Sequence, residues 1–363
     1  MMIMRGGGTT TTSAMRRKCT AVHHAPGRSG RLSSSRTKRT RRVGVDAARG
    51  AATGDEEGEV DEMTGEIRRA YGKRSEKDVR VRVNGEEVSM HVFEVQPEDA
   101  DVREGGRQGV TNVVCLHSVL TNSYIYRGVL PLLAKEGMRA IAIDFAGHGK
   151  SFVPSGNAGF DYSPDAYIAS LDAIFDALNL GDGDSSSSTM LITQGFVLGQ
   201  YGMLFAARHP ERIGKLVVMN TPLVHRGLPD PLAAYKNPIM KAFMTNTVDA
   251  GIFVAGGGPY ALAYADAEAF REPYSKEGGE AAVNAMKLIM DKYDPKAVAA
   301  AVDSAYSKWR KDTLMAWGGS DKYISDQLGQ NDFYNWLETK RTNIRGHVFL
   351  GKVGHFPQVR TST

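Results

Sequence analysis

Cysteine is nearly absent from this sequence, which has two in 363 residues. Cys19 lies in a basic N-terminal leader and Cys115 lies in a predicted buried strand. A mature chain without the leader therefore has no cysteine pair for an internal disulfide, which fits a reducing compartment. Long apolar runs are absent too: no stretch of 18 apolar residues is present, so the sequence predicts no membrane-spanning helix.

Acidic residues are almost missing from the first 53 positions. This leader contains ten Arg, two Lys and a single acid, Asp46, for a net charge of +11, whereas residues 54–363 carry −7. The acidic body argues against a nucleic-acid-binding face. The leader is rich in Ser and Thr, which is typical of an organellar transit peptide; a nuclear or RNA-binding tail is the alternative. We expect targeting to a plastid (chloroplast), with the mitochondrion as second choice, and an acidic linker over 54–75.

Continuous apolar runs and helical patterns alternate along the rest of the chain. Two runs on either side of Asn84-Gly85, 79–83 and 89–96, predict an antiparallel hairpin. Six further runs have the composition of strands in a parallel sheet flanked by helices. They are Val110–His117, Arg139–Asp144, Met190–Gln194, Lys215–Asn220, Asp312–Gly318 and Arg345–Leu350. Helices are predicted at Tyr124–Glu136, Pro164–Leu178, Val197–His209 and Gln327–Thr339. This order predicts a doubly wound, mostly parallel α/β sheet of about eight strands.

Residues 222–311 interrupt the alternation. They contain only helical patterns and the loop Gly256-Gly257-Gly258-Pro259. A helical insertion between two strands accounts for this stretch. The α/β core is therefore predicted to comprise residues 76–221 and 312–363.

The segment Gly195-Phe196-Val197-Leu198-Gly199 has the outline of a nucleophile elbow and no nucleophile. Glycines two positions either side of the central residue let a buried strand turn sharply into a helix. The central side chain is then presented at the top of the sheet. Covalent catalysis needs Ser, Cys or Asp there, and Val197 has no atom that attacks an electrophile.

Four other segments accompany the elbow in a fixed order. They are Cys115–Ser118 with the following residues 121–127, Asp144–Ser151, Trp317–Asp321 and Gly354–Gln358. Together they resemble the α/β-hydrolase superfamily, and within it the haloalkane dehalogenase and epoxide hydrolase-like branch, over about residues 76–358. The resemblance implies an α/β-hydrolase fold with residues 222–311 as a helical lid after strand six, and it fits an organelle-targeted plant or algal member.

The resemblance also implies a site. Asp321 and His355 correspond to the acid and the base of a catalytic triad, in which a carboxylate orients the imidazole that moves a proton. The oxyanion-hole N–H groups correspond to Leu198 and Val119. The pocket for a small apolar organic molecule under the lid would be lined by His117, Ser118, Val197 and Tyr126. No metal and no cofactor are expected.

Departures from the family bear on activity. A dehalogenase-type site has Asp at the elbow, a Trp after it and an Asn just after the first His-Gly pair, and here these positions hold Val197, Leu198 and Val119. Dehalogenation is therefore excluded; epoxide hydrolases need the same Asp, and esterases need Ser there. One hypothesis is hydrolase or proton-abstraction activity through Asp321 and His355. The alternatives are a non-catalytic ligand-binding pseudoenzyme, or a sequence under relaxed constraint.

Overall fold

Eight strands form one sheet in the order β10-β9-β8-β7-β5-β6-β4-β3. The pairs β3–β4 and β4–β6 are antiparallel and all other neighbours are parallel. The strands are β3 (Lys73–Val83), β4 (Glu86–Gln96), β5 (Asn112–Leu116), β6 (Arg139–Ile143), β7 (Thr189–Gln194), β8 (Lys215–Met219), β9 (Asp312–Gly318) and β10 (Ile344–Leu350). The predicted mostly parallel sheet of about eight strands is confirmed.

The structure is a computed structural model. It describes residues 59–60, 67–68, 71–98, 112–154, 160–181, 189–223, 227–243, 249–259, 261–275, 279–324, 336 and 344–359. These residues belong to the compact unit Glu56–Thr363. Apart from the large sheet, β1 (Glu59–Val60) and β2 (Ile67–Arg68) form a short antiparallel pair. The predicted leader and nearly all of the predicted helix Gln327–Thr339 lie outside the described residues.

The centre of the sheet is apolar because its strands are covered on both faces. All but one residue in each of β5, β6, β7 and β8 are buried. At the edge, β3 and β4 are joined through Asn84 and Gly85, whose φ values are +49° and +89°. Two successive positive φ angles are what the common two-residue hairpin turn requires. The predicted hairpin is therefore confirmed.

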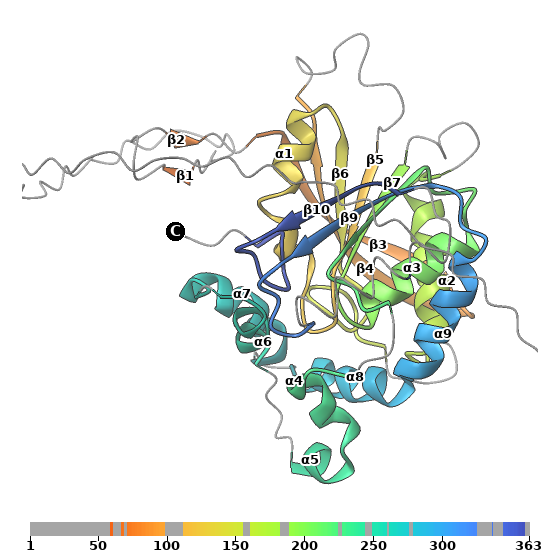
Figure 1. Cartoon of the computed structure of the whole chain (residues 1–363), viewed down its shortest axis with the longest axis vertical. Coiled ribbons are helices and arrows are strands. Elements are labelled where there is room, and N and C mark those ends of the chain that lie inside the picture. Colours follow the sequence, from red (N-terminus) through yellow and green to blue (C-terminus); the bar gives the residue numbers. More distant parts are fainter. Residues whose placement is uncertain are drawn as a thin grey trace, which may run out of the picture. The chain divides into compact units, whose positions relative to one another are not determined.

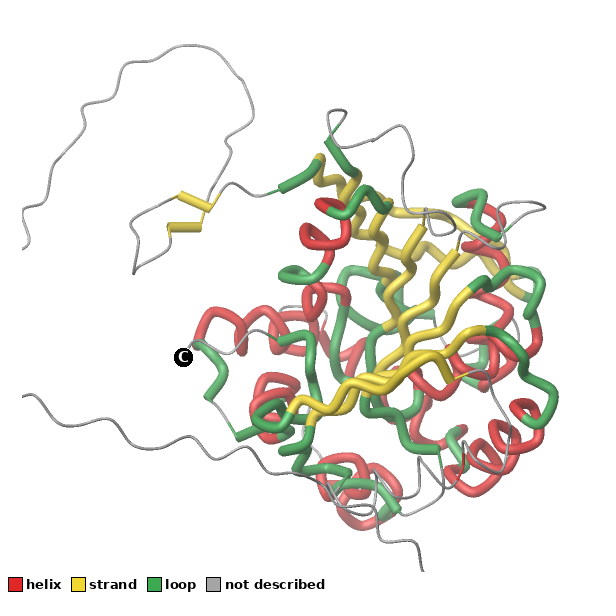
Figure 2. Tube along the Cα trace, turned by 45° about the horizontal axis from the view of Figure 1, so that its top comes forward, coloured by secondary structure: helices red, strands yellow, loops and turns green. Residues whose placement is uncertain are grey.

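Helices lie on both sides of the sheet. α1 (Leu130–Lys135) is on one side, and α2 (Pro164–Ala177), α3 (Leu198–Arg208) and α9 (Pro295–Tyr306) are on the other (Figure 1). Figure 2 shows the strands as a twisted layer between these helices. The layers place every loop that follows a parallel strand at one edge of the sheet, where open α/β sheets bind ligands.

The predicted single helix Tyr124–Glu136 is wrong in its first half. A short 3-10 helix, η2 (Ser123–Tyr126), is followed by a separate α1. Pro131 lies in the first turn of α1, where its missing N–H costs nothing. In a longer helix that proline would lack the hydrogen bond to residue 127, so the chain restarts there.

The segment between β8 and β9 is helical, as predicted. It contains α4 (Asp230–Ala233), η4 (Ala234–Lys236), α5 (Pro238–Phe243), α6 (Ala250–Gly256), α7 (Tyr264–Ser275), α8 (Gly279–Lys292) and α9. The Tyr293 hydroxyl, just after α8, donates to Gln200 on α3 at 2.6 Å, and the Tyr306 hydroxyl at the end of α9 donates to the Met203 carbonyl at 3.0 Å. These bonds tie the insertion to the helix that follows the elbow. None of the helices in the described ranges is long and apolar enough to cross a bilayer.

Candidate functional site: an elbow, a loop and an Asp–His pair

The elbow keeps its strained backbone although its central residue is valine. β7 ends at Gln194, α3 begins at Leu198, and Val197 between them has φ +61° and ψ −80°. A β-branched residue rarely adopts a positive φ, and such strain costs on the order of 1–3 kcal/mol. Gly199 is required for the close packing here, because a Cβ atom on it would lie 2.4 Å from the Gln194 carbonyl oxygen. The chain therefore turns sharply between β7 and α3, with Val197 at the centre of the turn.

Gln200 braces this turn. Its Oε1 accepts the Val197 N–H at 3.3 Å and the Tyr293 hydroxyl at 2.6 Å, and its Nε2 donates to the Pro222 carbonyl at 3.0 Å. One amide thus connects the elbow, the helical insertion and the loop after β8. We did not single out Gln200 from the sequence, since a glutamine in a helix shows no signal of such tertiary contacts.

Asp321 and His355 form the pair that the sequence predicts. Asp321 follows β9 and His355 lies in the loop after β10, and His355 Nδ1 is 2.8 Å from Asp321 Oδ2. Neither side chain has any exposed surface. A carboxylate at Nδ1 holds the proton on that nitrogen and leaves the lone pair on Nε2. His355 Nε2 is buried and has no hydrogen-bond partner among the described residues.

The Asp321 carboxylate is held by three further donors. Asn220 Nδ2 donates to Oδ2 at 2.7 Å, and the Tyr323 and Ile324 N–H groups donate to Oδ1 at 2.7 and 2.9 Å. Asn220 itself sits at the end of β8 with φ +40°, and its Oδ1 accepts the Gly318 N–H at 2.8 Å. Asn220 is a site residue that we did not find from the sequence. Its signal was its place directly after a buried strand; Asp321 lies three residues after the end of β9.

The His355 ring is fixed on its faces and edges as well. It stacks on Phe196 of the elbow with ring centroids 5.0 Å apart, and Tyr323 and Phe356 meet it edge-on. Gln194 Nε2 donates to the His355 carbonyl at 2.9 Å. The imidazole therefore has a single orientation, with Nε2 directed toward the elbow.

A segment of the helical insertion covers His355. The His355 N–H donates to the Gly257 carbonyl at 2.8 Å, and a Cβ atom on Gly257 would lie 2.9 Å from His355 Cβ. Val197, Leu198, Ser118 and His355 all have 0% exposure. These four residues are thus shielded from solvent in this structure.

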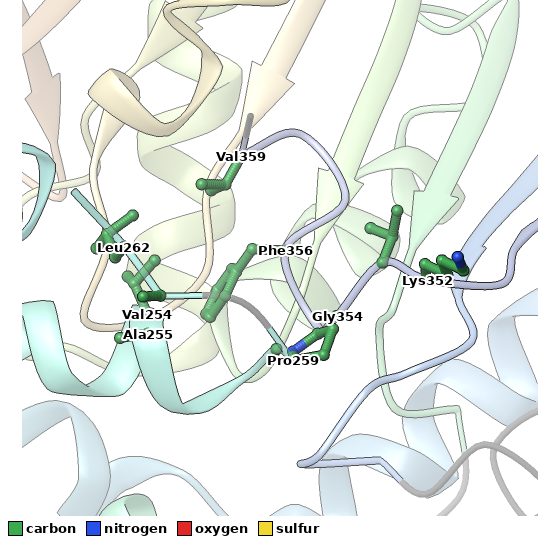
Figure 3. A pocket seen from close by; sticks show the side chains of 11 residues that line it. Val254, Ala255, Pro259, Leu262, Lys352, Gly354, Phe356 and Val359 are labelled. Carbon is green, nitrogen blue, oxygen red and sulfur yellow. The ribbon is translucent and has the colours of Figure 1, made fainter. Parts of the chain in front are cut away.

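A small apolar cavity lies beside the covered site, between α6 and the loop after β10. Its volume is about 50 Å³, and Val254, Leu262, Phe356 and Val359 are among its lining residues (Figure 3). Figure 3 shows Phe356, the neighbour of His355, directed toward Val254 and Leu262. This cavity is large enough for one or two water-sized groups.

Metal binding finds no support in the described residues, which show no group of three or more His, Cys, Asp or Glu side chains that could hold a metal ion.

The two predicted oxyanion donors differ in availability. The Val119 N–H donates to the Phe196 carbonyl at 3.3 Å, so it is engaged by the elbow. Leu198 is the first residue of α3, where a backbone N–H has no acceptor within the helix. The start of a helix also favours negative charge. Leu198 is therefore the better placed of the two donors.

His117 and Tyr126 use their polar groups inside the protein. His117 Nδ1 donates to the Ser118 carbonyl at 2.7 Å and its Nε2 accepts the Phe145 N–H at 3.0 Å, and the Tyr126 hydroxyl donates to the Leu116 carbonyl at 2.8 Å. Burial lowers the pKa of His117 to about 4, which keeps it neutral. Both residues therefore brace the loop after β5.

Comparison with known proteins agrees with this architecture. The sequence pattern of the family described as alpha/beta hydrolase fold matches residues 111–183. A haloalkane dehalogenase of Mycobacterium marinum is 30% identical over 221 residues, which is 58% of this chain and 69% of that protein. A cis-3-alkyl-4-alkyloxetan-2-one decarboxylase of Shewanella oneidensis is 32% identical over 173 residues, which is 47% of this chain; the matched part spans only half of that relative.

Solved structures show the same fold at lower sequence identity. A haloalkane dehalogenase from Bradyrhizobium elkanii superimposes with a TM-score of 0.58 at 20% identity, covering 78% of this chain and 92% of the other. A meta-cleavage product hydrolase from Pseudomonas fluorescens gives a TM-score of 0.57 at 18% identity, covering 77% and 91%. At these identities the likeness concerns the fold.

Proposed function

The chain belongs to the α/β-hydrolase superfamily and is related to the haloalkane dehalogenases, and we propose that it acts on a small apolar substrate by general-base catalysis through Asp321 and His355. The observation that carries this proposal is the buried His355 Nε2, which has no hydrogen-bond partner in the described part of the chain and is oriented by the 2.8 Å hydrogen bond between Nδ1 and Asp321. Every donor around Asp321 supports the ionised carboxylate that such a pair needs. Val197 takes no chemical part.

The chemistry open to this site is proton transfer. His355 would take a proton from a water that attacks an electrophilic carbon, or from an acidic carbon of the substrate. The Leu198 N–H would stabilise the negative charge that develops. General-base catalysis contributes roughly 10²–10⁴-fold, so a hydrolase without a covalent step would be slow, and proton abstraction would lose less.

The helical insertion, residues 222–311, would act as the lid. The hydrogen bond from the His355 N–H to the Gly257 carbonyl and the close approach of Gly257 to His355 Cβ support this role, because both join the insertion to His355. In the same proposal the leader, residues 1–53, directs import into a plastid, with the mitochondrion as the alternative. A fluorescent fusion of the leader, compared with one in which its arginines are replaced, tests organelle targeting independently of catalysis.

A screen of short aryl esters, epoxides and carbon acids with the purified chain tests the catalytic proposal. Turnover that falls at least about 100-fold in His355→Ala supports base catalysis. His209→Ala is the matched control, since His209 is a histidine on the far end of α3 with partly exposed surface. Turnover that is the same in wild type and His355→Ala contradicts the mechanism.

A second function is favoured by the closure of the site. Val197 and Leu198 are fully buried and apolar, and the Val119 N–H is already engaged. A pocket of this kind suits an apolar ligand, since no hydroxyl at the elbow has to be desolvated. Saturable binding of an apolar fluorophore, unchanged in His355→Ala and accompanied by no turnover of any screened compound, would establish the binding protein in place of the enzyme.

A further inference from the structure

Ser118 is a buried hydroxyl beside the elbow whose present hydrogen bond is replaceable. It has 0% exposure, and its Oγ donates to the Phe196 carbonyl over a long 3.3 Å. The same carbonyl accepts the Val119 N–H, also at 3.3 Å. Phe196 therefore keeps a donor when Ser118 turns away, and the turn leaves no buried carbonyl without a partner.

Gly195 of the elbow lies close to both Ser118 and His355. A Cβ atom built on Gly195 would lie 2.5 Å from Ser118 Oγ and 3.3 Å from His355 Nε2. The hydroxyl oxygen and the imidazole nitrogen are therefore both close neighbours of Gly195, and a side chain at position 195 would collide with Ser118. His355 Nε2 is the buried nitrogen that lacks a hydrogen-bond partner among the described residues.

We propose that Ser118 is the nucleophile of this site and that small apolar carboxylic esters are its substrates. The proposal rests on His355 acting as a base, as proposed above. A rotation of Ser118 about its Cα–Cβ bond exchanges the Phe196 carbonyl for His355 Nε2 as the acceptor of its proton. The result is a Ser–His–Asp relay, Ser118–His355–Asp321, in which the hydroxyl comes from the loop after β5. Such relays are defined by geometry and not by sequence position.

The reaction proceeds in two balanced steps. Ser118 Oγ attacks the carbonyl carbon of the ester while its proton passes to His355 Nε2; the C–O bond to the alcohol breaks, and the departing alkoxide takes that proton. Water, deprotonated by His355, then attacks the ester formed on Ser118. The carboxylic acid leaves and the proton returns to Ser118 Oγ. The Leu198 N–H, at the start of α3, is the donor for the oxyanion in both steps.

Covalent labelling of the whole chain with a small serine-reactive fluorophosphonate tests the proposal. Ser118 Oγ displaces fluoride from phosphorus and its proton goes to His355, so intact mass and peptide mapping report the adduct directly. We expect one adduct on the peptide that contains Ser118, absent in Ser118→Ala, and formed about 100-fold more slowly in His355→Ala. Ser170→Ala is the matched control: Ser170 is equally buried and donates to the Tyr167 carbonyl at 2.8 Å, and it lies on α2.

The outcomes separate this proposal from the proposed function. An adduct at another residue, or no adduct in a wild-type chain whose ester turnover depends on His355, overturns Ser118 as nucleophile and leaves base catalysis intact. Neither adduct nor turnover in the wild type overturns both. Because mapping is done on the wild-type chain, the result does not depend on whether Ser118→Ala folds.

Discussion

The two halves of the site have been kept to different degrees. The base half, Asp321, His355 and Asn220, retains each polar group that its geometry calls for, with four donors on one carboxylate. The nucleophile half, the elbow Gly195–Gly199 with the loop His117–Thr121, has the sharp turn of an elbow, but the central residue of that turn, Val197, carries no reacting atom. The positive φ at a valine costs free energy and brings no packing benefit of its own. The comparison therefore favours the proposed function, in which His355 acts as a base.

Removing Asp321 is the change with the largest expected effect on the base half. Asp321→Ala leaves His355 Nδ1 and the Tyr323 and Ile324 N–H groups without their acceptor, and Asn220 Nδ2 keeps only the long 3.4 Å hydrogen bond to the Gly318 carbonyl. We expect the free energy of unfolding to fall by about 3–5 kcal/mol, measured by urea denaturation. Asp165→Ala is the control, because this carboxylate is exposed and pairs with Arg208 at the surface, and it should change the value by less than about 0.5 kcal/mol. A loss below about 1 kcal/mol for Asp321→Ala would show that the base half is not a tightly satisfied network.

Lowering the pH tests the stability of the nucleophile half, because one buried neutral histidine, His117, belongs to it and a second, His148, lies beside His117. Burial lowers the pKa of His117 to about 4 and that of His148 to about 3, and the two rings are 5.3 Å apart. Unfolded histidine takes up a proton near pH 6.5. Between pH 6.5 and 4 the unfolded state therefore binds more protons, and the free energy of unfolding falls as the pH is lowered. Burial raises the pKa of Asp144, which acts in the opposite sense.

We expect His117 alone to lower the free energy of unfolding by roughly 2 kcal/mol between pH 6.5 and 5, at about 1.4 kcal/mol for each pH unit. The measurement is a series of urea unfolding curves from pH 7 to 5, above the range in which Glu94, with a pKa of about 2, contributes. A flat profile over this range would show that the histidines of the nucleophile half are not held neutral.

Much of the fold and part of the candidate site could be predicted from the sequence. Continuous apolar runs located β5 to β8 because strands buried on both faces can contain little else. Similar runs located β9 and β10, although Val348 and Phe349 of β10 are exposed. Asp321 and His355 were found because both follow predicted strands in a family spacing. Gln200, Asn220 and the engaged Val119 N–H were missed, because each depends on contacts between segments far apart in the chain. The closure of the site by Gly257 could not be predicted either, since local periodicity does not show which loop covers which residue.

Placing a hydroxyl at the centre of the elbow tests whether this position of the nucleophile half faces His355 of the base half. Val197→Ser places an Oγ atom on the turn at which residue 197 has φ +61°. The preceding residue, Phe196, stacks on the His355 ring. We expect a second fluorophosphonate adduct, at position 197, formed about tenfold faster than that of the wild type. Val302→Ser serves as control, because Val302 is equally buried on α9 and lies outside the site. If position 197 stays unlabelled in Val197→Ser, the elbow no longer presents its central residue to His355.

The smallest expected effect concerns the strain at Val197 itself. Truncation to alanine or to glycine removes the buried methyl groups in both cases, so the difference between the two variants isolates the backbone. At Val302, inside α9, glycine should be about 1 kcal/mol less stable than alanine, because it loses more conformational freedom on folding. At Val197 the order should be reversed by a similar amount, since glycine adopts a positive φ without strain and alanine does not. Urea unfolding of the four variants gives both differences. If alanine is the more stable residue at both positions, the elbow is an unstrained turn, and its backbone ceases to be evidence that the nucleophile half was kept for a function.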